Sequence, residues 1–146
     1  MKNKTIIIIL LILSIIGLFA SAYLTVLHFI PTDSFCDLNA TFSCSKINQS
    51  KYSSFLGIPV ALLGLCGYLI FIIINLSLLF VKSLEKYKKQ LSRLQLTLSV
   101  LALIFSLYLT YIEFAVLWTL CILCLTSQIV LFMLVFFSYV YYNRLK

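Results

Sequence analysis

Three long apolar runs dominate this sequence, at residues 5–30, 57–81 and 94–142. A helix needs about 20 residues to cross the roughly 30 Å hydrocarbon core of a bilayer, so each of the first two runs has the length of one crossing. The third would form a helix roughly 74 Å long, far longer than one crossing, so it must fold back. Glu113 and Trp118 interrupt its apolar pattern, and we place a turn at residues 115–119.

We therefore expect an all-α integral membrane protein, a four-helix bundle with spans at about 5–30, 58–81, 94–114 and 120–142. The composition agrees, because 63% of the residues are hydrophobic and only 10% are charged, more apolar than a soluble domain of 146 residues could bury. One membrane domain accounts for residues 1–146. The polar stretch between spans one and two, residues 31–56, is expected to form an outer loop with a short interfacial helix.

The basic residues predict the orientation of these spans. The formal net charge is +7, but the lysines and arginines form short clusters between the apolar runs, so nucleic acid binding is not expected. Because basic residues gather on the cytoplasmic side, we expect a multi-pass cell-membrane protein with both termini in the cytoplasm. Nine of the 11 basic residues then share that side: Lys2, Lys4, Lys82, Lys86, Lys88, Lys89, Arg93, Arg144 and Lys146.

The first span has a second interpretation. Lys2, Lys4, the apolar stretch and Ala20-Ser21-Ala22 resemble a secretory signal with its cleavage site. The apolar run continues to Ile30, well beyond that site, which favours a membrane span.

Two segments of the chain are similar to each other. SAYLTVLHF at 21–29 and SLYLTYIEF at 106–114 share Ser, Tyr, Leu, Thr and Phe in register, and each is followed seven residues after its Phe by a cysteine. This similarity predicts that spans one and three run parallel. His28 and Glu113 occupy matching places in it, where they are either solvated at the outer interface or take part in proton transfer.

Four of the five cysteines form two pairs on the predicted extracytoplasmic side. Cys121 and Cys124 lie one helical turn apart, where a disulfide can join them, and the start of a helix favours a thiolate at Cys121. Cys124 lies slightly deeper, where a hydrophobic electron acceptor could approach from the lipid. The alternatives for this pair are a structural disulfide or buried thiols.

Cys36 and Cys44 lie in the polar outer loop, within reach of water. Ser43 and Ser45 are predicted caps of a short helix continuing through Ile47, Tyr52 and Phe55, whose apolar side would cover the site. Asp37 and Ser50 are expected to order this loop.

The two cysteine pairs together predict a relay. An outside dithiol would reduce Cys36–Cys44, which would reduce Cys121–Cys124, which would pass two electrons to the acceptor. A loop staple and a zinc site of four thiols are the alternatives, but the spacing of Cys36 and Cys44 is too wide for the usual zinc pattern and no metal is expected. A disulfide-stapled membrane scaffold or channel subunit remains the competing function. Cys66, between two glycines, is interpreted as a packing residue where helices approach closely.

In this ordered set of motifs the chain resembles the vitamin K epoxide reductase (VKOR) family, in its short form without a fused thioredoxin domain. The likeness covers nearly the whole chain and rests on Cys36-Asp37, Cys44-Ser45, Ser50, Gly57-Ile58-Pro59-Val60 and Cys121-Ile122-Leu123-Cys124. The unrelated DsbB-type proteins carry their close and spaced pairs in the reverse order.

The resemblance implies a quinone-dependent thiol oxidoreductase that generates disulfides for oxidative protein folding. It implies a membrane quinone of the ubiquinone or menaquinone (vitamin K) type as cofactor and a secreted thioredoxin-fold, DsbA-like protein as partner. Cys36 and Cys44 would be the shuttle pair, Cys44 would attack Cys121, and Cys124 would contact the quinone. Gln128, which stands where vertebrate members have a tyrosine, is a further candidate contact, and plain quinone reduction is the expected reaction.

Overall fold

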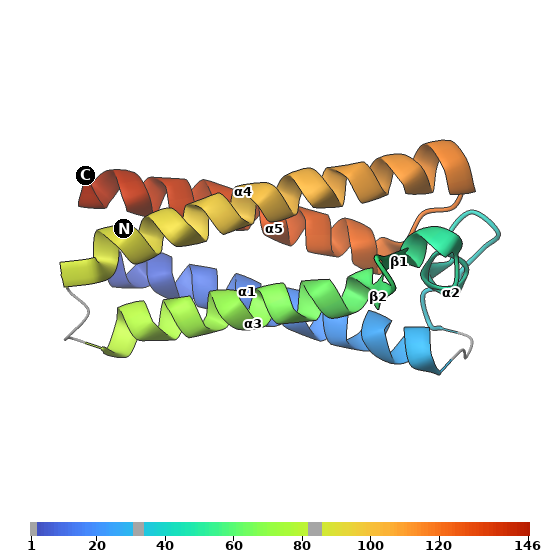
Figure 1. Ribbon diagram of the computed structural model, residues 1–146, viewed down its shortest axis with the longest axis horizontal. Helices are drawn as coiled ribbons and strands as arrows, with labels where there is room; N and C mark the ends of the chain where they lie inside the picture. The colour runs from blue at the N-terminus through green and yellow to red at the C-terminus, as the bar shows by residue number, and fades with distance from the viewer. Residues whose placement is uncertain (1–2, 31–33, 82–85) are drawn as a thin grey trace.

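The computed structural model describes residues 3–30, 34–81 and 86–146, so Lys2, Lys82 and residues 31–33 of the predicted loop lie outside the described residues. Within these described ranges, four helices are long and apolar enough to cross a membrane (Figure 1). This confirms the predicted all-α membrane bundle. The elements are α1 (Asn3–Phe29), α2 (Cys44–Asn48), a 3-10 turn (Lys51–Ser53), β1 (Ser54–Phe55), β2 (Ile58–Pro59), α3 (Val60–Phe80), α4 (Lys88–Ile112), a π-helical turn (Glu113–Leu117) and α5 (Ile122–Leu145).

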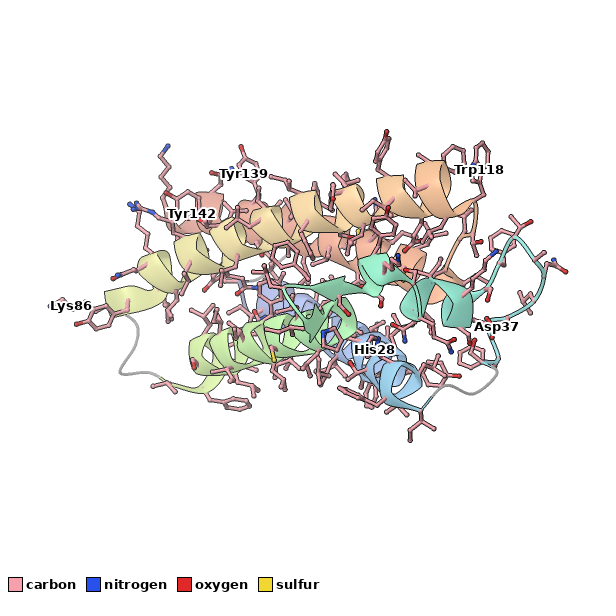
Figure 2. All side chains as sticks on the ribbon, turned by 45° about the vertical axis from the view of Figure 1, so that its right-hand side comes forward. His28, Asp37, Lys86, Trp118, Tyr139 and Tyr142 are labelled. Atoms are coloured by element: carbon pink, nitrogen blue, oxygen red, sulfur yellow. A yellow bond between two sulfur atoms is a disulfide. The ribbon has the colours of Figure 1, made fainter. Side chains whose placement is uncertain are left out.

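The four long helices lie side by side, and α1 and α4 run in the same direction, opposite to α3 and α5 (Figure 1). Spans one and three are therefore parallel, as the internal similarity predicted. The start of α1, the end of α3, the start of α4 and the end of α5 lie at one end of the bundle, with α2, β1 and β2 at the other. Lys86, Tyr139 and Tyr142 lie toward the first end, whereas Asp37 and Trp118 lie at the second (Figure 2).

Helix α1 occupies the centre of the packing. It contacts both α3 and α5, whereas α4 packs mainly on α5 and only sparsely on α3. Apolar side chains from α1, α3 and α5 form the main core, for example Leu10, Phe71 and Leu134. Since α1 supplies several of the most deeply buried side chains, it is an integral part of the bundle described here.

The entry into α3 differs from the expected one. The second span was predicted to begin at residue 58, but Pro59 precedes the helix and pairs with Ser54 in a two-stranded hairpin. The cause lies in the turn, where Leu56 and Gly57 have φ angles of 53° and 82° and so reverse the chain in two residues. This geometry keeps Ile58 and Pro59 extended, and the helix begins at Val60, two residues later than predicted.

The short outer helix is also smaller than predicted. Ser43 caps α2 by accepting a hydrogen bond from the backbone N–H of Lys46, while Ser45 lies inside the helix. The helix ends at Asn48, so Tyr52 lies in the 3-10 turn and Phe55 in β1. The polar run of Gln49, Ser50 and Lys51 ends the helix, because Ser50 turns its hydroxyl back to the carbonyl of Ile47 at 2.7 Å.

Candidate active site at the outer end of the bundle

Asp37 organises the loop that carries the first cysteine pair. Its carboxylate accepts hydrogen bonds from the backbone N–H groups of Ser34 (2.9 Å) and Ser45 (3.2 Å). It also accepts from the hydroxyls of Ser43 (2.8 Å) and Ser45 (2.6 Å). Burial raises the pKa of this carboxyl, but the four hydrogen bonds outweigh it and hold the pKa well below its usual range. The loop is therefore held to the start of α2 by a charged acceptor.

Replacing Asp37 with asparagine is expected to loosen this loop, because an amide cannot accept from all four donors. Half-exposed charged hydrogen bonds, discounted for solvent screening, suggest a loss of about 1–2 kcal/mol in local stability. At neutral pH the amides of residues 34–45 should exchange with deuterium roughly 5–30-fold faster.

The pH dependence of that difference follows from the sign of the shift. The stabilisation is present above the ordinary carboxyl pKa of about 3.9 and is lost as pH falls through the lower pKa of the folded protein. The wild type and the variant should therefore converge in strong acid. Asn39→Ser, at an exposed site in the same loop, serves as the control. Equal exchange in the Asp37 variant and the wild type at pH 7 would show that the loop does not depend on this carboxylate.

The first cysteine pair is closed. Cys36 and Cys44 form a disulfide with their Cα atoms 5.9 Å apart. The hydroxyl of Ser34 lies 3.4 Å from the sulfur of Cys36, and Cys44 is completely buried as the first residue of α2. Cys36 is itself only 2% exposed, so the expected access to water is not found here: both sulfurs lie inside the protein, with that of Cys36 beside the hydroxyl of Ser34.

A short backbone pairing brings the second pair to the first. The chain before Cys44 and the chain before Cys121 form a parallel bridge between Phe42 and Leu120. Two hydrogen bonds hold the bridge, from the N–H of Leu120 to the carbonyl of Thr41 at 2.7 Å and from the N–H of Ser43 to the carbonyl of Leu120 at 3.2 Å. The register places the sulfur atoms of Cys44 and Cys121 only 3.0 Å apart.

Cys121 and Cys124 are free thiols at the start of α5. Cys121 is the N-cap of this helix, and its sulfur accepts a hydrogen bond from the backbone N–H of Cys124 at 3.3 Å. The sulfur of Cys121 thus touches the loop disulfide, and Cys124 lies one turn deeper in the bundle.

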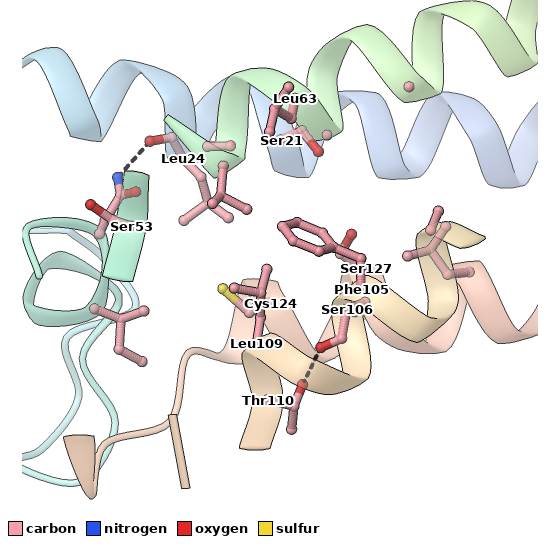
Figure 3. Close-up of a pocket in the computed structure, with 18 of the residues that line it drawn as sticks. Ser21, Leu24, Ser53, Leu63, Phe105, Ser106, Leu109, Thr110, Cys124 and Ser127 are labelled. Atoms are coloured by element: carbon pink, nitrogen blue, oxygen red, sulfur yellow. Dashed lines mark hydrogen bonds between the residues drawn. The ribbon is translucent and has the colours of Figure 1, made fainter. Parts of the chain in front are cut away.

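Beside Cys124 lies a cavity of about 460 Å³ inside the outer half of the bundle (Figure 3). Both Cys44 and Cys124 line it, with side chains from all four long helices and from the hairpin. The lining is mostly apolar, but the hydroxyls of Tyr68 and Ser127 meet in it at 2.7 Å. An apolar cavity of this size with a few convergent polar groups is typical of a small-molecule site.

The internal similarity contributes symmetrically to this cavity. Ser21 and Leu24 of α1 face it from one side, and their counterparts Ser106 and Leu109 of α4 face it from the other (Figure 3). At the outer end the ring of Phe55 in β1 stacks edge-on against Phe105 of α4, with centroids 5.8 Å apart. The hairpin thus covers the cavity, as the predicted interfacial segment was expected to do.

The comparison with protein families supports this architecture independently. The sequence model of the vitamin K epoxide reductase family matches residues 8–139, nearly the whole chain. The chain belongs to this family. Membership in the VKOR family implies a multi-pass membrane oxidoreductase that generates disulfides and is linked to a quinone. None of the curated proteins compared with the chain matches it.

Within this VKOR bundle, two further predicted site residues have clear positions. Ser50 joins the end of α2 to the 3-10 turn, since its carbonyl also accepts from the hydroxyl of Ser53 at 2.7 Å. Gln128 does not line the cavity, but its side-chain carbonyl accepts a hydrogen bond from Thr110, which does. A quinone contact by Gln128 stays a prediction, and its link to the cavity runs through Thr110.

His28 and Glu113, equivalent in sequence, have different surroundings. The Nδ1 of His28 lies 3.0 Å from the backbone carbonyl of Asn48, so its N–H donates to the end of α2. Glu113 is only 4% exposed and lines the cavity. The structure also corrects the interpretation of Cys66, whose side chain is exposed on α3 instead of packing between helices. The flanking glycines misled the sequence argument, because only Gly64 lies close to another helix, at Ser21 of α1.

Sequence reasoning missed Tyr68, Ser127 and Asn48. Tyr68 fits into the bundle only because Gly17 has no side chain, since a Cβ there would lie 2.2 Å from the Tyr68 ring. Asn48 is buried and donates to the carbonyl of Leu24 at 2.6 Å, which fastens α2 to α1. A tyrosine in the middle of a span and an asparagine inside the outer loop were the available signals.

Proposed function

We propose that this VKOR-family protein is a quinone-dependent thiol oxidase that supplies disulfides to a secreted thioredoxin-fold partner of the DsbA type. Electrons enter at Cys36–Cys44, pass to Cys121–Cys124 and leave to a membrane quinone of the ubiquinone or menaquinone type. The observation that carries the proposal is the 3.0 Å distance between the sulfurs of Cys44 and Cys121, beside a cavity that Cys124 lines.

Each cysteine has a distinct part in this relay. One thiol of the partner's dithiol attacks Cys36 and leaves Cys44 as the attacking thiolate, and the partner's second thiol then displaces Cys36 and closes the partner's disulfide. Cys44 is already within the roughly 3–3.5 Å separation of a near-attack arrangement with Cys121. Its attack on a Cys121–Cys124 disulfide releases Cys124, and Cys36 then closes the loop disulfide again and frees Cys121. Asp37 and Ser50 keep the loop in place during this exchange.

The cavity fits a quinone by its chemistry. Its volume lies within the roughly 300–1,000 Å³ range of ligand sites, and its apolar walls suit a ring with an isoprenoid tail. Cys124 would contact the ring, and the Tyr68–Ser127 hydroxyl pair is placed to hydrogen-bond to a ring oxygen. A bound quinone would accept two electrons and two protons.

The basic residues support an orientation with both termini and the α3–α4 connection in the cytoplasm. All four paired cysteines then lie at the extracytoplasmic end, where secreted proteins acquire disulfides. The loop pair then lies on the partner's side of the membrane, and Cys124 of the second pair lines the cavity proposed for the lipid-soluble acceptor.

A reconstituted assay tests the function. Purified protein, given a reduced thioredoxin-fold protein and a soluble quinone analogue, should oxidise one partner dithiol for each quinone reduced, measured by quinone absorbance and free-thiol titration. A stapled scaffold or channel subunit would show neither change, and its disulfide would resist mild reductant. Partner thiols that remain reduced in the presence of quinone would refute the proposed function.

A further inference from the structure

Glu113 is a buried carboxyl that the cysteine relay does not use. It begins the π-helical turn Glu113–Leu117 at the end of α4 and is 4% exposed. Its Oε2 accepts the backbone N–H of Cys121 at 3.3 Å, and its side chain is hydrogen-bonded to the thiol of Cys124. It also lines the cavity. One carboxyl thus touches both residues of the reactive pair and the space beside them.

No ion pair accounts for the burial of the Glu113 carboxyl. Within the described residues, no lysine, arginine or histidine pairs with it. A buried carboxyl without a counter-charge is costly, and ionisable residues inside a membrane bundle commonly mark proton paths. The wider π-helical turn, a feature frequent at functional sites, directs this residue back toward the start of α5. The titratable side chains that share the cavity with it are Tyr52, Tyr68 and Cys124, and Cys44 joins them only when its disulfide with Cys36 is reduced.

We infer that Glu113 is the proton carrier between the Cys121–Cys124 pair and the cavity, a role that rests on the proposed function. Joining the two thiols forms one S–S bond, breaks two S–H bonds and releases two electrons and two protons. The electrons go to the quinone named above. The Glu113 carboxylate takes the proton of Cys124, releases it to a quinone oxygen, and then does the same for the proton of Cys121. The carboxylate is unchanged at the end.

Glu113→Gln tests this role with little disturbance, because the amide oxygen still accepts the N–H of Cys121. Turnover with quinone should fall on the order of 10²-fold, the usual scale of general acid–base catalysis. The wild-type rate should decline in acid, where the carboxyl already holds a proton, and this acidic limb should be missing in the variant. Glu113→Asp, which keeps a carboxyl, should restore the limb.

A second readout needs no quinone. Infrared difference spectra between the reduced and oxidised Cys121–Cys124 pair should contain a carboxyl band that disappears in Glu113→Gln. A Gln variant with the wild-type rate, the same acidic limb and the same band would overturn the inference. That result would leave the proposed function intact as long as Cys124→Ala still abolishes quinone reduction, whereas activity in Cys124→Ala would remove the proposed function itself.

Discussion

Cys124→Ala is expected to abolish quinone reduction, with a loss on the order of 10³-fold or more, because groups that act as a unit lose most of their activity together. Without this sulfur, Cys121 has no partner with which to form the disulfide that releases two electrons. The measurement is quinone absorbance with a reduced thioredoxin-fold substrate. Cys66→Ala is the matched control, since Cys66 is the exposed cysteine of α3 and touches neither pair.

The same substitution should expose the preceding step. Combined with Cys36→Ser, it leaves Cys44 and Cys121 as a pair whose sulfurs lie 3.0 Å apart. A mild oxidant should then join α2 to α5, and mass spectrometry after proteolysis should find the crosslinked peptides. Wild-type turnover in Cys124→Ala, or no crosslink in the double variant, would contradict the assigned roles.

The sequence was sufficient for the parts of the fold that depend on the length of the apolar runs. An apolar run long enough to cross a bilayer is expected to form a helix, because a helix satisfies every backbone N–H and C=O group within the segment, where no water is available. The turn that must divide residues 94–142 lies at Trp118, which has a left-handed φ of 50° and is 77% exposed. Paired cysteines at helix starts likewise indicated chemistry from local pattern alone.

The contacts that complete the site could not be predicted, because they depend on packing across the chain. The pairing of Phe42 with Leu120, which sets the distance between Cys44 and Cys121, joins two segments with no recognisable strand pattern. The Gly17–Tyr68 contact similarly involves residues on different helices, and small residues in spans are too common to indicate which one receives a ring. Which residues of two helices face each other depends on tertiary packing, which cannot be predicted from a single sequence.

Gly67→Leu is expected to fill the cavity without disturbing the bundle. Gly67 lines the cavity, and a Cβ built there meets no atom within 4 Å, so a leucine side chain can extend into the space proposed for the quinone. Leucine is also the better helix former, which favours α3. Overpacking of a fitted site costs about 1–3 kcal/mol, equivalent to a roughly 5–150-fold weaker affinity.

Two measurements distinguish a filled cavity from damage to the cysteine relay: the KM for quinone and the rate of thiol exchange between the two cysteine pairs. In Gly67→Leu the KM for quinone should rise by that factor, while exchange between the two cysteine pairs, followed by thiol trapping without quinone, keeps its wild-type rate. Cys66→Leu adds the same side chain one position away on the exposed face of α3, and its KM should stay at the wild-type value. If Gly67→Leu leaves the KM unchanged, the acceptor binds elsewhere, because a leucine side chain inside this cavity would occupy space that a ligand bound there needs.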